Sequence, residues 1–585
     1  MVFLRKEHDT IMKKWFLYQK KADFNGIGAR YGISPILARI LCNRDVQSEE
    51  QLRMYLEGTL EDCHDPALLP DIQKAVELLK EKIAEGKAIR VIGDYDVDGI
   101  CSTYILVETL QRMGAKVDAA IPHRIKDGYG LNDNLIEEAH TDGIDTILTC
   151  DNGIAAIAQV ELAKNLGMTV IVTDHHEVPF TEQEDGTRLY KMPPADAVVD
   201  PKREDNRYPF PGICGAVVAW KLVQLLCPED SVFLREELLQ VAALATVCDV
   251  MELKDENRII VGEGLKQMNT APIPGLRALV EAAGLQEKAL SAYHLGFVIG
   301  PCLNATGRLD TAGRALELLQ AKDRATAASI AQELRDLNES RKEMTKEGVE
   351  EAVELAQRQL ETTGKLDSVL VIYLPELHES LAGIVAGRIR EKYTRPVFVL
   401  TDGQEEVKGS GRSIAGYDMY GEMTRCGDLF LKYGGHKMAA GLSIPREKVE
   451  EFRERMNRNC PLTEAELIDK VYIDVAMPFA YANEQLVGEF EKLEPFGNGN
   501  SKPLFAQKNV RVYQPRIFGR QRNVLKCRLV DGNGTERQGV YFGEVEEFME
   551  FLESHGGAPI SILYQPTINS YRGDSHIELV IEDYC

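Results

Sequence analysis

The stretch that decides the expected fold is Ala88-Ile89-Arg90-Val91-Ile92-Gly93-Asp94-Tyr95-Asp96-Val97-Asp98-Gly99-Ile100. Its first half is apolar and β-branched, which predicts a buried strand. Its second half has carboxylates at alternate positions, and residues 100–113 show the apolar spacing of a helix. The carboxylates therefore lie on a strand-to-helix turn, and in open α/β sheets ligands bind at the edge where such turns lie.

Asp94, Asp96 and Asp98 should repel one another strongly if this turn is shielded from water. A divalent cation is the simplest remedy, and hard oxygen ligands suit magnesium or manganese. An ordinary surface turn rich in aspartate and glycine is the alternative reading of the stretch.

Three later strands also end in acidic or imidazole groups. Asp151 follows residues 146–150, Asp174-His175-His176 follows residues 169–173, and Asp200 follows residues 197–199. Strands that alternate with helices predict a mostly parallel sheet covered on both faces, so these groups should share one rim. Asp249 lies in an apolar neighbourhood, which favours a paired or metal-bound acid. A helix-capping aspartate is the alternative.

Length and composition bound the class of protein. At 585 residues the chain predicts about three or four domains. No apolar run reaches the length of a membrane span, and no secretory segment opens the chain, so we expect a cytoplasmic protein. The 12 cysteines form no Cys-x-x-Cys pair, which argues against a zinc site. The net charge of -24 requires any polyanion to enter a locally basic or metal-neutralised groove.

The expected fold class is α/β, with two α/β lobes joined by a long helix and followed by a C-terminal β-barrel. The predicted parts are a helical segment (1–70), the acidic α/β lobe (71–260), a helical connector (261–364), a second α/β lobe (365–455) and a β-rich domain (456–585). The connector contains one long charged helical pattern from residue 325 to about 360. The short strands of the last part suggest an OB-fold.

Two regions outside the first lobe carry basic groups. Residues 408–413 and 434–437 are predicted glycine-rich loops that would let backbone N–H groups approach a phosphate, although tight structural turns fit equally well. The β-rich domain concentrates positive charge near aromatic rings, which suits single-stranded nucleic acid. An ordinary solvated face is the alternative there. The residues concerned are Arg516, Arg520, Arg522, Lys526 and Arg528, beside Tyr513 and Phe518.

These motifs resemble those of a known family. Residues 93–99, 151–153, 174–176 and 249 are similar to the four motifs of the DHH phosphoesterases, and residues 411–413 and 434–436 to the DHH-associated second domain. Residues 122–124, 128–130, 304–308 and 495–497 resemble the RecJ single-strand-specific exonucleases. The resemblance covers nearly the whole chain.

The resemblance implies two lobes around a cleft with an OB-fold nearby. It also implies a two-metal phosphodiesterase that degrades single-stranded DNA from the 5′ end in recombination and repair. The cofactors would be two Mn²⁺ or Mg²⁺ ions, with a helicase and a single-strand-binding protein as partners of a monomer. The implied metal ligands are Asp94, Asp96, Asp98, Asp151, His175 and Asp249, with Asp151 bridging both ions. Asp98, Asp151 and His176 would be catalytic, and His176 would face the scissile phosphate.

We expect nine residues to contact the nucleic acid. The resemblance implies Arg124, Asn304, Arg308, Ser410, Arg412 and His436, and the basic β-rich domain adds Arg520, Arg522 and Lys526. Three departures from the family pattern put DNA contacts in doubt rather than the chemistry. Cys302 replaces a basic residue, residues 377–380 read Leu-His-Glu-Ser instead of Trp-His-Pro-Gly, and Asp200 replaces an asparagine, so Asp200 is not counted as a ligand.

Other functions remain open on the sequence. A phosphodiesterase for short oligonucleotides or cyclic dinucleotides, or a pyrophosphatase, would carry related motifs but has no evident use for the basic β-rich domain. A catalytically inactive DNA-binding scaffold is the alternative from another class. The complete set of acids and His175 argues against a scaffold, because an inactive protein would be free to lose them.

Overall fold

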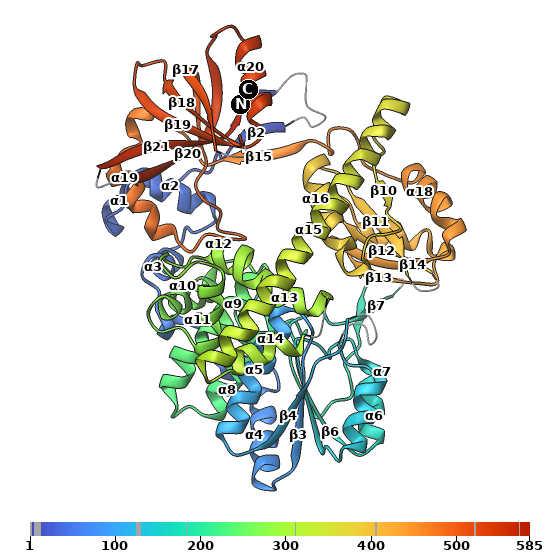
Figure 1. Ribbon diagram of the computed structural model, residues 1–585. Coiled ribbons are helices and arrows are strands. Elements are labelled where there is room, and N and C mark those ends of the chain that lie inside the picture. The colour runs from blue at the N-terminus through green and yellow to red at the C-terminus, as the bar shows by residue number, and fades with distance from the viewer. Residues whose placement is uncertain are drawn as a thin grey trace. The chain divides into compact units, whose positions relative to one another are not determined.

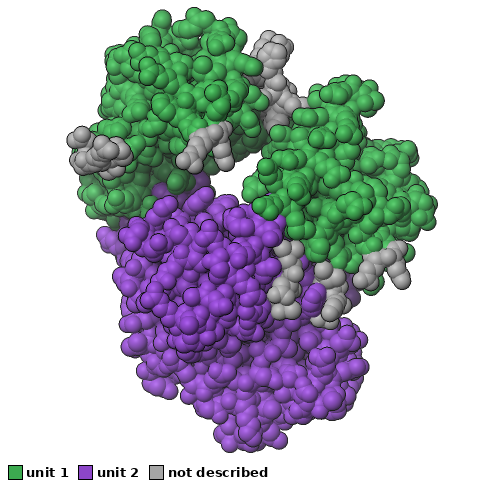
Figure 2. Space-filling model, in the orientation of Figure 1, with its two compact units in different colours: residues 1–48, 343–494, 502–585 green, residues 49–342, 495–501 purple. Residues whose placement is uncertain are grey.

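The computed structural model describes residues 3–4, 13–124, 130–183, 185–309, 312–403, 406–519, 522–571 and 574–585. The chain forms two compact units, coloured separately in Figure 2. Unit 1 contains residues 1–48, 343–494 and 502–585, and unit 2 contains residues 49–342 and 495–501. None of the helices in the described ranges is long and apolar enough to cross a bilayer.

Unit 2 is built on a five-stranded parallel sheet in the order β4-β3-β5-β6-β9. The strands are β3 (Ala88–Ile92), β4 (Lys116–Ala120), β5 (Thr146–Cys150), β6 (Thr169–Thr173) and β9 (Ala197–Val199). This is a doubly wound order in which the direction of strand addition reverses at β3 and β5. The predicted parallel sheet is confirmed, and the edge at which sheets of this kind bind ligands lies where β3 and β5 end.

Helices cover both faces of this sheet (Figure 1). One core joins Ile89 and Val91 to α4, α5, α8 and α9, and a second joins Ile92 and Ile147 to α6 and α7. Because both faces are buried, the strands are apolar throughout rather than alternating. The helices are α4 (Ile72–Ala84), α5 (Val97–Arg112), α6 (Asp133–Thr141), α7 (Ile157–Asn165), α8 (Gly215–Leu226) and α9 (Leu239–Cys248).

The second half of unit 2 is helical. It contains α10 (Asp255–Thr270), α11 (Pro274–Ala282), α12 (Ala292–His294), the π-helix η4 (Leu295–Ile299), α13 (Gly300–Leu309) and α14 (Gly313–Gln320). The predicted long helix is confirmed as α15 (Arg324–Thr363), one continuous element of 40 residues that begins in unit 2 and ends in unit 1.

Unit 1 contains a second sheet, in the order β10-β11-β12-β14-β13, with only the β10–β11 pair parallel. Its strands are β10 (Leu370–Tyr373), β11 (Val397–Asp402), β12 (Val407–Arg412), β13 (Lys432–His436) and β14 (Ala439–Ile444). The helices α16 (Ala382–Tyr393), α17 (Met419–Thr424) and α18 (Val449–Arg458) belong to the same α/β part.

The two glycine-rich stretches predicted as loops are strands, so that prediction was wrong. They form β12 and β13, on either side of β14. The glycines serve close packing here: a Cβ at Gly411 would lie 2.5 Å from the Met419 sulfur and 2.6 Å from the Phe398 ring. The sequence pattern could not distinguish this use of glycine from a turn.

A β-barrel forms the C-terminal part of unit 1. Its strands are β17 (Phe505–Phe518), β18 (Val524–Val530), β19 (Glu536–Phe542), β20 (Ile560–Tyr571) and β21 (Asp574–Tyr584). The order β17-β18-β19-β21-β20 closes because β20 also pairs with β17. The predicted β-barrel is therefore confirmed, and it has five strands, with the helix α20 (Val545–Ser554) between β19 and β20.

We expected the N-terminal segment to be helical, but it also contains strands. It contains α1 (Phe24–Tyr31), α2 (Pro35–Asn43) and α3 (Glu49–Glu57), but β2 (Lys13–Leu17) is a strand. Strand β2 pairs antiparallel with β1 (Phe3–Leu4) and parallel with β15 (Asp469–Ile473). The pairing with β15 joins segments more than 400 residues apart, which local sequence patterns cannot reveal.

Candidate metal centre and nucleic-acid interface

The acidic turn after β3 is held in a specific shape. Asp96 is the N-cap of α5 and accepts a hydrogen bond from the Gly99 N–H at 3.0 Å. A Cβ at Gly99 would lie 2.5 Å from the backbone oxygen of Asp94, so only glycine fits there. Asp98 then lies in the first turn of α5. The three carboxylates thus begin at the predicted strand-to-helix turn.

Asp98 is oriented by a second helix. The N–H groups of Gly215 and Ala216, at the start of α8, donate to its two carboxylate oxygens at 2.7 and 2.8 Å. The positive end of the helix dipole stabilises a carboxylate in this position. Gly215 permits the approach, because a Cβ there would lie 2.8 Å from the Cβ of Asp151. No pattern in the sequence indicated this support.

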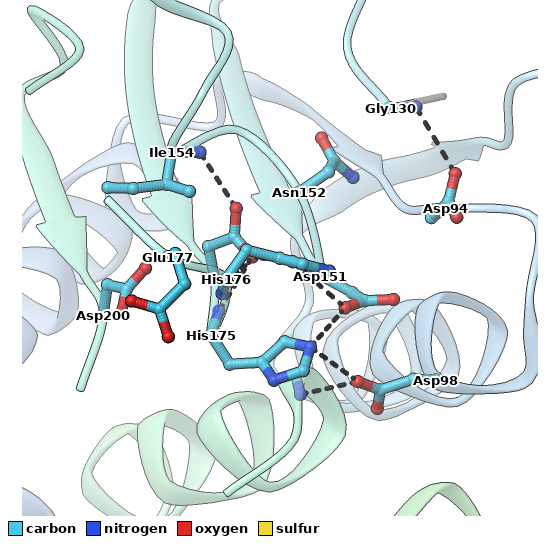
Figure 3. Close-up of polar contacts among 12 residues, drawn as sticks. Asp94, Asp98, Gly130, Asp151, Asn152, Ile154, His175, His176, Glu177 and Asp200 are labelled. Carbon is cyan, nitrogen blue, oxygen red and sulfur yellow. Dashed lines mark hydrogen bonds and ion pairs between the residues drawn. The ribbon is translucent and has the colours of Figure 1, made fainter. Parts of the chain in front are cut away.

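Carboxylates surround one imidazole nitrogen at the centre of the site (Figure 3). His175 Nε2 lies 3.0 Å from Asp151 Oδ1, 3.5 Å from Asp98 Oδ2 and 3.7 Å from Asp249 Oδ2. These distances satisfy an ion pair, yet Nε2 forms no hydrogen bond with any described residue. Burial lowers the pKa of His175 to about 4, despite the raising effect of Asp98. A neutral imidazole facing several carboxylates is the arrangement that metal coordination requires.

Asp151 reaches this point through strained backbone. It follows β5 directly and has a φ of 59°, in the left-handed region that non-glycine residues rarely adopt. Burial raises the pKa of Asp151 well above its usual range, and the charge of Asp98 adds to this. Strain and charge crowding at one buried aspartate point to a functional constraint.

The other acids of the cluster are destabilised as anions in the same way. Burial, reinforced by Asp96, raises the pKa of Asp94 to about 8. Burial, reinforced by Asp98, raises the pKa of Asp96, and also raises that of Asp249 to about 8. Asp94 Oδ2 is buried without a hydrogen-bond partner among the described residues. The cluster therefore has unmet demand for positive charge.

The donor atoms fit divalent cations. Three sets have ligand atoms within 4.8 Å of one another, and together they bring six predicted ligands and His176 into one cluster. The sets are Asp94, Asp96 and Asp151; Asp98, His175 and Asp249; and Asp151, His175 and His176. Carboxylate oxygens with one or two imidazoles suit Mn²⁺ or Mg²⁺.

Asp174 orients His176 and was missed as a site residue. Its Oδ1 accepts from the backbone N–H of His175 at 2.7 Å and lies 2.7 Å from His176 Nδ1, while Oδ2 accepts from the Ile154 N–H at 2.9 Å. Burial, the largest single effect, would lower the pKa of His176, but the hydrogen bond to Asp174 and the charges of Asp174, Asp249 and Asp98 together raise it to about 9. His176 is therefore cationic at neutral pH. The position of Asp174 directly before two histidines at a strand end was the available signal.

Three predicted DNA contacts lie beside the acidic turn. The Arg124 guanidinium lies 4.8 Å from the centre of the Tyr95 ring, and Arg308 is close enough to act on the pKa of Tyr95. Asn304 Oδ1 accepts from the Val97 N–H at 3.2 Å, so its side chain also supports the turn. Residues 128 and 129 of the quoted motif lie outside the described residues.

Ser410, Arg412 and His436 share one face of the second sheet. Arg412 on β12 and His436 on β13 both stand opposite Ala439 of β14, the strand between them. Arg412 Nη1 donates to Ser410 Oγ at 3.2 Å. A Cβ at Gly383, near the start of α16, would lie 2.7 Å from the Arg412 guanidinium. This face combines a guanidinium, a hydroxyl and an imidazole beside small residues, which suits a phosphate.

A groove of about 480 Å³ crosses the barrel strands β17 to β19. Its lining includes Arg516, Phe518, Lys526 and Arg528. Two of these cations face acids on the protein: Arg528 lies 3.0 Å from Glu536, and Lys526 lies 3.4 Å from Glu578. Arg522 does not line the groove and lies 3.6 Å from Glu546. The Arg528 guanidinium also lies 4.9 Å from the centre of the Tyr513 ring. Arg520 lies outside the described residues.

The departures from the family pattern have local structural explanations. Cys302 is buried and donates to the Val298 carbonyl at 3.2 Å, and Leu377 joins the core beneath β10. Ser380 Oγ lies 2.7 Å from His378 Nδ1, and Glu379 pairs with Lys408 at 2.7 Å.

Comparison with known proteins agrees with this architecture. Residues 88–246 match the DHH family N-terminal domain, residues 366–460 the DHHA1 domain and residues 473–583 the RecJ OB domain. The single-stranded-DNA-specific exonuclease RecJ of Escherichia coli is 33% identical over 94% of this chain and 96% of its own length. That of Bacillus subtilis is 32% identical over 94% of this chain and 68% of its own length.

A solved structure matches the fold along most of the chain. The crystal structure of RecJ in complex with Mn²⁺ from Thermus thermophilus aligns with a TM-score of 0.79 and 29% identity, covering 98% of this chain and 79% of that one. The extent of both the sequence and the fold similarity leaves one assignment: this chain belongs to the RecJ family of single-stranded-DNA-specific exonucleases.

Proposed function

We propose that this chain hydrolyses phosphodiester bonds of single-stranded DNA, starting from the 5′ end, with two divalent cations. The observation that carries the proposal is the buried ring of carboxylates around His175 Nε2, which crowds more negative charge than the cationic ring of His176, 3.9 Å from Asp151, can balance. The substrate follows from the family, whose named members are single-stranded-DNA-specific exonucleases.

Two groups of residues would hold the cations, Mn²⁺ or Mg²⁺. Asp94 and Asp96 would hold one, and Asp98, His175 and Asp249 the other. Asp151 belongs to a donor set with Asp94 and Asp96 and lies 3.0 Å from His175, so it would serve both. When bound, two cations activate a water nucleophile and neutralise the charge that develops on the phosphate and leaving group.

The side chains of the site have complementary roles in this proposal. The α8 N-terminus holds the Asp98 carboxylate in one orientation, so that ligand geometry does not have to form during the reaction. Asp174 keeps His176 protonated and fixed, and the cationic ring would donate a hydrogen bond to a non-bridging phosphate oxygen.

Binding of the strand and its polarity would depend on the basic groups. We assign Arg124, Asn304, Arg308, Ser410, Arg412 and His436 to the DNA backbone or the 5′ phosphate. Arginine can bind a terminal phosphate through two parallel hydrogen bonds, which favours exonucleolytic attack at an end. The barrel groove, which Lys526 lines, would contact the strand further along, together with Arg520 and Arg522 from the sequence between β17 and β18.

The biological setting remains part of the proposal. An exonuclease of this kind would act in DNA recombination and repair in the cytoplasm. A helicase would supply single strands, and a single-strand-binding protein would share the substrate. We propose that the chain acts as a monomer.

The decisive experiment is digestion of single-stranded DNA labelled at one end or the other. The reactions contain Mn²⁺, Mg²⁺ or EDTA, with Asp98→Ala as the inactive variant and Asp336→Ala, on the exposed side of α15, as the matched control. We expect metal-dependent loss from the 5′ end by the wild type and by Asp336→Ala alone. Rapid cleavage of dinucleotides with slow action on long DNA would favour the short-oligonucleotide phosphodiesterase. Binding without cleavage under every metal would favour the scaffold.

A further inference from the structure

A basic and aromatic segment outside the proposed site has no assigned role. Residues 13–21 read Lys13-Lys14-Trp15-Phe16-Leu17-Tyr18-Gln19-Lys20-Lys21 and contain four lysines, three aromatic residues and no acid. This composition is unusual in a chain whose net charge is -24. Lysines interleaved with aromatic rings are typical of surfaces that bind single-stranded nucleic acid.

The segment contains β2, whose inward face is fixed by Trp15. This side chain is buried and packs with Ile473 of β15 and Leu563 of the barrel, and its Nε1 donates to Asp583 at 2.9 Å. Because side chains alternate along a strand, Lys14 and Phe16 point to the opposite face of the sheet. Lys470 and Tyr472 stand opposite them on β15, which runs beside β2 (Figure 1).

Three aromatic rings form a ladder on that outward face. Tyr472 stacks on Phe16, with ring centres 5.7 Å apart, and on Tyr18, with centres 5.3 Å apart. Tyr472 remains 50% exposed. Cross-strand stacking alone would account for such rings as support for the sheet.

The lysines beside the ladder are not explained by sheet stability. Lys14 and Lys470 are directly opposite each other, and like charges in this position are destabilising. Within the described ranges neither has an acid within ion-pair distance, whereas Lys13 lies 3.9 Å from Asp583 and Lys20 lies 2.5 Å from Asp45. A bound anion would remove the repulsion between Lys14 and Lys470.

We propose that this surface, the β2–β15 face of Lys14, Phe16, Tyr18, Lys470 and Tyr472, binds single-stranded DNA. The two lysines would contact phosphates, and the exposed ring of Tyr472 would stack on a base. This contact is additional to the metal centre and the barrel groove. The choice of ligand rests on the proposed function, whereas the site itself rests on the geometry of the face.

The first test measures binding of the full chain to a long fluorescent single strand in EDTA, so that no cleavage occurs. Lys14→Gln combined with Lys470→Gln should make the negative slope of log K against log salt shallower, by about 0.7 for each lost phosphate contact. The same double variant should have an unchanged or higher melting temperature, since it removes a like-charge pair. An unchanged affinity and salt slope would overturn the proposal. Lys346→Gln, an exposed lysine of α15, is the matched control.

The second test removes the stacking surface. Tyr472→Ala should weaken binding roughly tenfold, because a stacked base contributes ~1–3 kcal/mol and ~1.4 kcal/mol corresponds to a factor of ten. Tyr481→Ala, which removes another exposed aromatic ring, should bind like the wild type. Equal affinity of Tyr472→Ala and wild type would contradict the base contact.

The two proposals can fail separately in these experiments. A wild type that digests single strands, together with β2–β15 variants that bind them normally, would overturn only the inference about this face. A wild type that never digests DNA would overturn the proposed function, and the EDTA binding data would still decide whether the face binds a single strand.

Discussion

The metal centre and the barrel groove both concentrate charge, but the carboxylates of the metal centre are buried and crowded, whereas two cations of the groove are partly exposed and paired with acids. At the metal centre, buried carboxylates face a neutral histidine, and Asp94 Oδ2 has no hydrogen-bond partner among the described residues. In the groove, Lys526 and Arg528 are partly exposed and each lies within 3.4 Å of a glutamate. Uncompensated buried charge is costly, so it indicates a missing partner, whereas paired surface charge carries little information about function.

Removal of a central carboxylate should have the largest effect and is the strongest test of this contrast. Asp151→Asn should lower the nuclease rate by on the order of 10³-fold, because metal stabilisation of the transition state is worth several kcal/mol and ~1.4 kcal/mol is a factor of ten. The metal-free variant should be at least as stable as the wild type, since a repelled carboxylate is gone. Rates with Mn²⁺ and melting curves in EDTA measure both effects. A variant that unfolds in EDTA would show that Asp151 serves the fold rather than the metals.

Loss of the orienting acid should have a smaller effect on activity. Asp174→Asn should reduce the rate by about 10–100-fold, as expected when a group that positions a catalytic residue is removed. The pKa of His176 is about 9 because Asp174, with help from Asp249 and Asp98, outweighs the effect of burial, so the variant should lose activity at a lower pH than the wild type. The pH profile of the rate is the measurement. An unchanged alkaline limb with a reduced rate would assign Asp174 a structural role only.

The metal centre should also make stability depend on pH when no metal is bound. The pKa values of Asp94 and Asp249 are about 8 in the folded chain, against a usual value of 3.8. As pH rises from about 4 to about 8, the unfolded chain loses these protons while the folded chain retains them, so the metal-free protein loses stability. The melting temperature gained on adding Mn²⁺ should therefore be several degrees larger near pH 8 than near pH 6. A gain that does not vary with pH would mean that the acids are not destabilised as anions.

Much of the metal centre could be predicted from the sequence. Asp94, Asp151 and His175 follow strands whose apolar runs are unambiguous, and parallel strands bring their carboxyl ends to one edge. The support from α8 could not be predicted, because Gly215 and Asp98 are 117 positions apart and glycine carries no chemical signal. The role of Asp174 required knowing where its oxygens point.

Unit 1 was harder to predict, because its structure depends on contacts between residues that are far apart in the sequence. The glycines of β12 and β13 indicated loops, yet they lie in strands where large neighbours fill the space of a side chain. The pairing of β2 with β15 gave no local signal. The positive residues of the barrel were visible in sequence, but the glutamates that face Lys526 and Arg528 became apparent only in the fold.

The paired charges of the groove allow a test with a gain of affinity. Glu536→Gln would release Arg528, which now lies 3.0 Å from the glutamate. Single-stranded DNA should then bind about 1.4- to fivefold more tightly, because an exposed ion pair is worth ~0.2–1 kcal/mol and ~1.4 kcal/mol is a factor of ten. Binding in EDTA at several salt concentrations measures this. Unchanged affinity would show that Arg528 does not contact DNA. Glu484→Gln, in the helix α19 (Glu484–Glu489), is the matched control.

The smallest effect on activity is expected for Asp200→Asn. This variant tests whether a buried carboxylate near the metal centre is always a metal ligand. Asp200 is fully buried, its Oδ1 accepts from the Lys202 N–H at 2.7 Å, and burial together with Asp174 raises its pKa to about 8. It belongs to none of the donor sets found among the described residues. Asp200→Asn should therefore leave Mn²⁺-dependent activity within about twofold, since asparagine can accept the same hydrogen bond. The melting temperature should exceed that of the wild type by an amount that grows from about pH 4 to about pH 8, because over that range the folded wild type retains a proton on Asp200 that the unfolded chain loses. A loss of activity comparable to that of Asp151→Asn would instead make Asp200 part of the metal centre, with Oδ2, which has no hydrogen-bond partner among the described residues, as the ligand atom.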